Sequence, residues 1–111
     1  MPKTIMYVKG VDGQVELTTD RVVVHREGLF NTLKYGRHAS HEIPLSSVSG
    51  IDFHDATFFT MGEIDFDHPG KMSDSKGKKN AVKFNKRHQK EFHALKEKIF
   101  QIIEYNHRQH R

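Results

Sequence analysis

Polar and apolar residues alternate in two neighbouring segments of the chain, 50–55 and 62–67. Because successive side chains of a strand point to opposite faces, the apolar positions predict a buried face and the polar positions an exposed one. If the two strands pair, one surface carries Asp52, His54, Glu63, Asp65 and Asp67. Such a surface is typical of an ordinary solvated sheet, of a contact site for a basic protein, of an imitation of nucleic-acid phosphates, or of a cation site.

Metal binding is the second chemistry that the residue types allow. The chain has nine histidines and no cysteine, so a zinc site needs three or four nitrogen and oxygen donors. The local groupings are His38 with His41, His107 with His110 and Glu104, and His54 with Asp52 and Asp55. None has a specific spacing, and the best candidate ligands, His54, Asp52 and Glu63, meet only if the two strands pair. We therefore predict neither a bound metal nor any other cofactor.

Charge is divided unevenly along the chain. Residues 1–67 carry six Lys and Arg against ten Asp and Glu, whereas residues 68–111 carry twelve against four. The candidate anion-binding residues of the basic part are Lys76, Lys78, Lys79, Lys86 and Arg87. They lack interleaved aromatic residues and any base-reading motif, so the pattern favours only weak binding of nucleic acid or anionic lipid. Two oppositely charged surfaces suit a protein partner with complementary charge.

Catalysis has the least support. The serines lie in no nucleophile-elbow context, there is no glycine-rich phosphate loop, and thiol chemistry is absent from a chain without cysteine. We predict a non-enzymatic protein with no evident small-molecule substrate. A length of 111 residues fits one domain. The lack of cysteine and of any stretch of roughly 18 apolar residues predicts a cytoplasmic protein with no membrane span.

The elements that must position these residues read as short strands followed by one helix. The N-terminal half contains alternating or β-branched segments separated by turns, at 4–9, 14–18 and 21–26. Pro44 cannot donate a ladder hydrogen bond, so 44–48 is predicted to be a helical turn or corner. Segment 68–80 is rich in turn formers and lysine and predicts a mobile basic loop before the last strand, 81–84.

A helix is predicted over about 86–105, with Asn85 as its N-cap and a frayed tail over 106–111. The apolar residues at helical spacing are Phe92, Leu95, Ile99, Ile102 and Ile103. A single face of the helix should therefore cover the sheet.

Five segments together resemble a known family by their order and spacing: 8–15, 25–29, 42–48, 61–66 and 80–84. The family is the short bacterial pleckstrin-homology-like (PH-like) domain of Gram-positive bacteria and their mobile elements, mostly of unknown function, and the resemblance covers nearly the whole chain. It implies a single α+β, mainly β domain over 1–111. Its six to seven strands would form a bent antiparallel sheet or partly open barrel, closed by the C-terminal helix. It implies no enzyme.

Phosphoinositide binding, which the wider PH fold performs with cations on the first hairpin, does not carry over. That hairpin offers Lys9 alone, beside Asp12 and Glu16. We predict instead a non-enzymatic interaction module that binds another protein and originates from a phage or mobile element. One alternative is an inhibitor of a host nucleic-acid enzyme, of anti-CRISPR type, with a DNA-mimicking acidic face. The other is weak nucleic-acid or anionic-lipid binding through the basic loop and helix.

Overall fold

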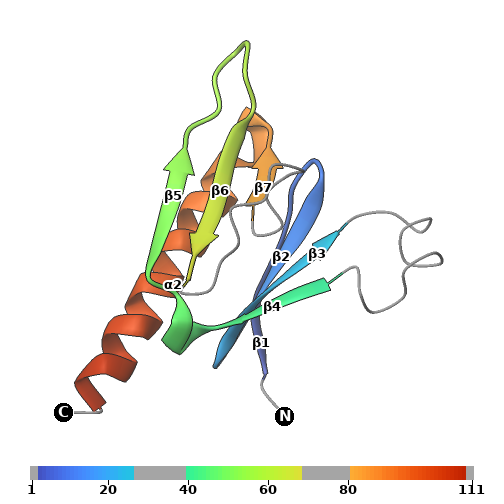
Figure 1. The fold of residues 1–111 in the computed structure, drawn as a ribbon. Coiled ribbons are helices and arrows are strands. Elements are labelled where there is room, and N and C mark those ends of the chain that lie inside the picture. The colour runs from blue at the N-terminus through green and yellow to red at the C-terminus, as the bar shows by residue number, and fades with distance from the viewer. Residues whose placement is uncertain (1–2, 27–39, 69–80, 110–111) are drawn as a thin grey trace.

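The computed structural model describes residues 3–26, 40–68 and 81–109. Within these ranges the chain forms two antiparallel sheets and one long helix, a mainly β architecture that is not a closed barrel (Figure 1). The first sheet has the order β1-β2-β3-β4, with β1 at Thr4–Lys9, β2 at Gly13–Thr18, β3 at Arg21–Arg26 and β4 at Ser40–Pro44. The second has the order β5-β6-β7, with β5 at Gly50–His54, β6 at Gly62–Asp67 and β7 at Ala81–Phe84.

The corner between the sheets forms where the sequence predicts it. Pro44 ends β4, and the 3-10 turn η2 (Leu45–Ser47) follows at once. The Leu45 N–H donates to the Asp20 carbonyl at 2.9 Å, which ties this corner to the turn between β2 and β3. Because proline cannot donate to a ladder, the strand ends here and the chain is free to enter the second sheet.

The two sheets are also joined at the turn between β1 and β2. The Val11 N–H donates to the Lys83 carbonyl at 2.6 Å, and the Lys83 N–H donates to Asp12 Oδ1 at 2.8 Å. A Cβ at Gly10 would lie 2.5 Å from both the Lys83 carbonyl oxygen and a Val82 methyl. Glycine is therefore required for this turn to approach β7 so closely.

Helix α2 (Gln89–Gln109) lies across the second sheet and closes the core (Figure 1). Phe92, Leu95 and Ile99 are buried, and Ile102 and Ile103 pack against the same core, so the predicted helical face is confirmed. Aromatic stacking fixes the helix on β7. The rings of Phe92 and Phe84 lie 4.5 Å apart and nearly parallel.

The predicted ends of the helix need two corrections. The chain leaves β7 through a 3-10 turn, η3 (Lys86–His88), and Asn85 occupies the N-cap position without a capping hydrogen bond from its side chain. At the other end the helix continues to Gln109, where the sequence predicts fraying from 106. Packing of Ile102 and Ile103 and the Glu104–Arg108 ion pair, 2.6 Å across one turn, support the extra residues.

Several predictions from the sequence fall outside the described residues. They concern most of the basic loop 68–80 with Lys76, Lys78 and Lys79, the histidines at 38 and 110, and the end of the tail. Among the residues that are described, no helix has both the length and the apolar character needed to cross a membrane.

Candidate functional site

The polar residues of the β5–β6 hairpin share one face, as their alternation predicts. In the antiparallel ladder Asp52 lies directly opposite Asp65, His54 opposite Glu63, and Gly50 opposite Asp67. The apolar residues of the same strands, among them Phe53 and Ile64, belong to the core side. We call Asp52, His54, Glu63, Asp65 and Asp67 the acidic face.

Much of the acidic face is covered, which differs from the open surface that the sequence predicts. Asp65 is only 4% exposed, Glu63 and Asp67 are half-buried, and Asp52 and His54 alone are exposed. The physical reason is position in the sheet, because β6 is the central strand and has a neighbour on each side, whereas β5 lies at an edge. A partner that approaches this face can therefore contact Asp52 and His54 directly, but not Asp65.

The acidic face brings together a different set of donors from the predicted zinc ligands. Carboxylate oxygens of Asp52, Asp65 and Asp67 lie within 4.8 Å of one another, and neither His54 nor Glu63 belongs to this group. Three carboxylates form a donor set for a hard cation rather than for zinc. Acidic groups of this kind are common without an ion, and we assign none.

The predicted basic face is represented by its helical part alone. Lys86 and Arg87 are exposed on η3, and Lys90 is exposed on the first turn of α2. In the part of the chain that the structure describes, none of these three cations forms an ion pair. We call Lys86, Arg87 and Lys90 the basic segment.

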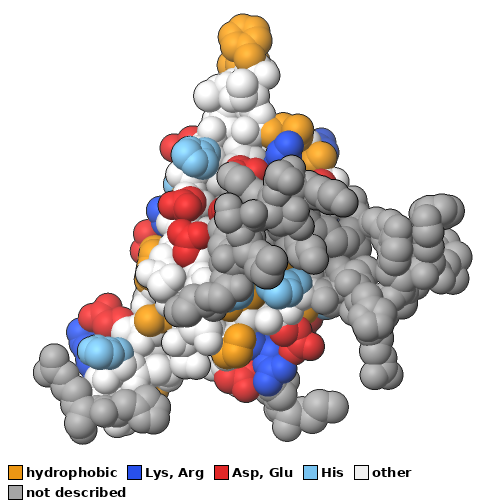
Figure 2. Space-filling view, in the orientation of Figure 1, with side chains coloured by type: hydrophobic (Ala, Val, Ile, Leu, Met, Phe, Trp, Pro, Cys, Tyr) orange, Lys and Arg blue, Asp and Glu red, His pale blue; other side chains and the backbone are white. Residues whose placement is uncertain are grey.

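Among the described residues, the most exposed large apolar side chains lie at the end of the β5–β6 hairpin, which projects from the fold (Figures 1 and 2). Phe58 is 88% exposed and Phe59 is 96% exposed, and Met61 beside them is about half exposed. Figure 2 shows these hydrophobic side chains at the top of the view. We call Phe58 and Phe59 the aromatic tip. The exposure of two adjacent phenylalanines at one projecting point is costly in water and is typical of a contact surface.

Hydrogen bonds between two threonines hold the turn that carries the aromatic tip. The Thr57 N–H donates to the Thr60 carbonyl at 2.8 Å, and the two hydroxyl oxygens lie 2.7 Å apart. The Thr57 hydroxyl also accepts from the N–H groups of Phe59 and Thr60, at 3.2 Å and 3.0 Å. The two rings are therefore presented on a preorganised turn.

The base of the hairpin is fastened to α2. The Ala56 N–H donates to the side-chain oxygen of Gln89, and His93 Nε2 lies 2.8 Å from Asp55 Oδ1. The His93 ring also packs on Phe53, with 4.4 Å between ring centroids. These contacts involve residues 53–56, and the turn at 57–60 projects beyond them.

One residue of the basic segment, Lys86, lies against the aromatic tip. Lys86 Nζ is 5.1 Å from the centroid of the Phe58 ring, a cation–π contact between η3 and the hairpin. The sequence predicts Lys86 and Arg87 as anion-binding residues, and no local pattern in it relates them to Phe58 and Phe59. The available signal was two consecutive phenylalanines at the point where a hairpin reverses, a position normally occupied by turn-forming polar residues.

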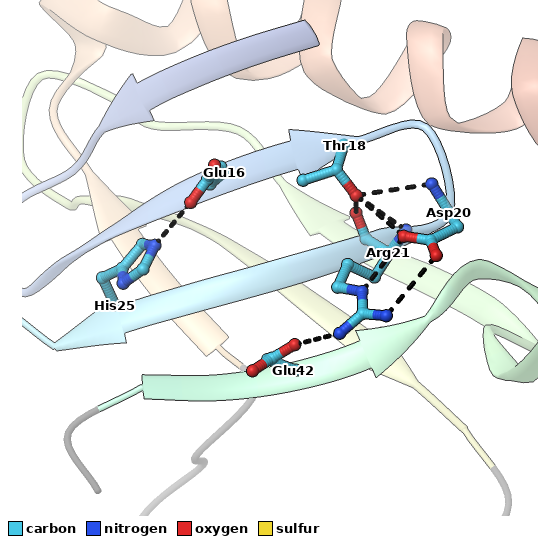
Figure 3. Close-up of polar contacts among 6 residues, drawn as sticks. All are labelled: Glu16, Thr18, Asp20, Arg21, His25 and Glu42. Atoms are coloured by element: carbon cyan, nitrogen blue, oxygen red, sulfur yellow. Dashed lines mark hydrogen bonds and ion pairs between the residues drawn. The ribbon is translucent and has the colours of Figure 1, made fainter. Parts of the chain in front are cut away.

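The outer face of the first sheet carries a separate set of polar contacts (Figure 3). His25 Nε2 lies 2.9 Å from Glu16 Oε1, and the Thr4 hydroxyl donates to the other oxygen of Glu16. These hydrogen bonds, that from Thr4 first, lower the pKa of Glu16 below its ordinary value. The carboxylate is thus favoured in the folded state, which is a structural role.

Arg21 forms the second part of this network (Figure 3). Its guanidinium lies 3.0 Å from Asp20 Oδ1 and also donates to Glu42 across the β3–β4 ladder. The hydrogen bond from Arg21 lowers the pKa of Asp20. The Thr18 hydroxyl accepts the Arg21 N–H at 3.1 Å and closes the β2–β3 turn. These contacts hold strands β2, β3 and β4 together.

A half-open hollow of about 480 Å³ lies at the far end of α2 from the aromatic tip. It is lined by Thr19, Asp20, Leu45, Ser46, Val48, Ile103, Asn106 and His107. Five of these eight lining residues are polar, and the one carboxylate among them, Asp20, is already paired with Arg21.

No protein-family model, curated protein or solved structure matches this chain.

Proposed function

We propose that this protein is a non-enzymatic interaction module that binds another protein through the aromatic tip. The observation that carries this proposal is the exposure of Phe58 and Phe59 on a turn closed by Thr57 and Thr60. Burial of a phenylalanine side chain is worth roughly 1.5–3 kcal/mol, and a partner pocket would recover this for both rings. Because the turn is already ordered by hydrogen bonds, little conformational entropy is lost on binding.

A PH-like architecture for this module is supported by the two antiparallel sheets followed by a C-terminal helix, the coarse arrangement that the resemblance in sequence implies. A phage or mobile-element origin stays a prediction from the resemblance. The DNA-mimicking alternative has less support, because it needs a row of accessible carboxylates and Asp65 is buried. Nucleic-acid or lipid binding by the basic part depends largely on Lys76, Lys78 and Lys79, which lie outside the described residues.

Affinity capture with matched variants tests the proposal. The unmodified protein, the Phe58→Ser/Phe59→Ser variant and a Tyr105→Ser control would each be used to capture partners from a lysate of the source organism. Tyr105 is a suitable control because it is an exposed aromatic residue on α2, away from the hairpin. We expect the unmodified protein and the control to retain the same stoichiometric protein and the tip variant to lose it. Retention by the tip variant would contradict the proposal.

A further inference from the structure

The charges around the aromatic tip point to the chemistry of its partner. We infer that the tip enters an apolar pocket of a protein whose rim carries carboxylates, and that the basic segment faces this rim. The inference deepens the proposed function and rests on it. It also goes further, because it says which charges the partner must present and which residues of this chain meet them.

One cation of the basic segment lies at the edge of the aromatic tip. Lys86 lies against the Phe58 ring, with its ammonium 5.1 Å from the ring centroid, so a positive charge stands at the edge of the apolar surface. Arg87 follows it on η3, and Lys90 lies on the next turn of the chain. A pocket that encloses Phe58 must bring its rim close to Lys86. Carboxylates on that rim would gain charge-assisted contacts, whereas cations would be repelled.

The cations of the basic segment are not engaged by carboxylates of the described residues. Within the described ranges Lys86, Arg87 and Lys90 form no ion pair, although other exposed cations of the chain do, including Arg21 and Arg108. Glu91, which follows Lys90 in the sequence, lies 3.8 Å from His88, and Asp55 at the base of the hairpin lies 2.8 Å from His93. The three cations are thus available to an external anion.

The charges of the hairpin distinguish a protein partner from an anionic membrane. The hairpin that carries the aromatic tip also carries the acidic face, with Asp52 and His54 exposed on β5. A uniformly negative lipid surface would attract the basic segment but repel the carboxylates of the same hairpin. A protein can place a carboxylate rim on one side of its pocket and neutral or basic groups on the other. The charge distribution therefore favours a protein partner.

Photo-crosslinking in the source organism tests the inference. The crosslinker p-benzoylphenylalanine replaces Phe59, so the aromatic character of the tip is kept. The same protein is then made with Arg87→Glu/Lys90→Glu, which leaves the Lys86–Phe58 contact in place. Acidic residues near a helix N-terminus are favourable, so this change should preserve the fold, and a thermal melt verifies that. The matched control is Lys3→Glu/Lys98→Glu, the same charge change at exposed residues away from the tip.

We expect a crosslinked protein whose yield falls about tenfold with Arg87→Glu/Lys90→Glu and is unchanged in the control, because steering by complementary charge alters association rates by at least this factor. The crosslinked peptide should come from an apolar pocket flanked by Asp or Glu. If the yield of crosslinked protein does not change with the charge reversal, the partner has no acidic rim that meets the basic segment, and the proposed function still holds. Absence of any protein adduct would contradict both.

Sedimentation with vesicles of equimolar phosphatidylcholine and phosphatidylserine tests whether the aromatic tip binds an anionic lipid surface in place of a protein. We expect the purified protein to stay in solution when these vesicles are sedimented. Sedimentation that disappears in the Phe58→Ser/Phe59→Ser variant would show that the aromatic tip enters lipid. That result would overturn the protein partner.

Discussion

Asp55 and His93 join the β5–β6 hairpin to the helix, with 2.8 Å between Asp55 Oδ1 and His93 Nε2. The two residues are distant in sequence, and their contact lies directly below the turn that carries the aromatic tip. Together with the Ala56–Gln89 hydrogen bond it determines how firmly the tip is held.

Replacement of His93 by alanine should loosen the hairpin. It removes one hydrogen bond and the stacking on Phe53, so we expect a loss of about 1–2 kcal/mol in the free energy of unfolding. Amide hydrogen exchange at Thr57 and Thr60 should quicken more than exchange in the first sheet. His107→Ala, at an exposed histidine of the same helix, is the control and should leave these rates unchanged. Equal effects of both variants would show that His93 does not anchor the hairpin.

Gly62 should tolerate no side chain. A Cβ at this position would lie 2.5 Å from the Phe84 ring and 2.6 Å from the His54 carbonyl oxygen. We expect Gly62→Ala to destabilise the protein by roughly 1–3 kcal/mol in chemical denaturation. Gly50→Ala is the matched control, because its Cβ would meet only Asp67 Oδ2 at 3.9 Å. Similar midpoints for the two variants would contradict the close approach of β6 to Phe84.

Glu16 should contribute to the loss of stability in acid. Hydrogen bonds from Thr4 and His25 lower its pKa in the folded state. A depressed folded pKa means that the contribution is fully present above the unfolded value and is lost as pH falls through the folded value. The variant Glu16→Gln should therefore lose less stability than the unmodified protein between about pH 5 and about pH 3. Parallel stability curves for the two proteins over this interval would refute the assignment.

Asp52 should be slightly unfavourable for folding. It lies directly opposite Asp65 in the ladder, and like charges at such positions destabilise a sheet by a few tenths of a kcal/mol to about 1 kcal/mol. We expect Asp52→Asn to raise the melting temperature at low ionic strength, with a smaller gain at high salt. Glu97→Gln removes an exposed carboxylate on α2 and should change little. A lower melting temperature for Asp52→Asn, together with a rise on addition of Mg²⁺ or Ca²⁺ that only the unmodified protein shows, would indicate a cation at the acidic face.

The aromatic tip should contribute to binding and not to stability. Since Phe58 and Phe59 are almost fully exposed, we expect their joint replacement by serine to change the free energy of unfolding by no more than about 0.5 kcal/mol. Phe92→Ala, at a fully buried phenylalanine, should cost about 3–5 kcal/mol. Urea denaturation of both variants measures the difference. A large loss in the tip variant would mean that the two rings support the fold.

Local patterns in the sequence predicted most of the elements and the buried side of several of them, but not strand β4 or the ends of the helix. Alternation in 50–55 and 62–67 predicted that Asp52, Glu63 and Asp65 share a surface, and the spacing of Phe92, Leu95 and Ile99 predicted the buried side of the helix. These patterns are readable because side-chain direction has period 2 in a strand and 3.6 in a helix. The corner after Pro44 was readable for a similar reason, since proline lacks the donor that a ladder requires.

The tertiary structure alone decided which of these residues are accessible and which lie together. Asp65 and Asp52 alternate in the same way, yet β6 is a central strand and β5 an edge, so one carboxylate is buried and the other exposed. The contact of Lys86 with Phe58 joins two segments that no local pattern relates. Strand order and helix docking are set by the packing of the whole core, and so the projecting aromatic tip with Lys86 against it emerged only from the folded chain.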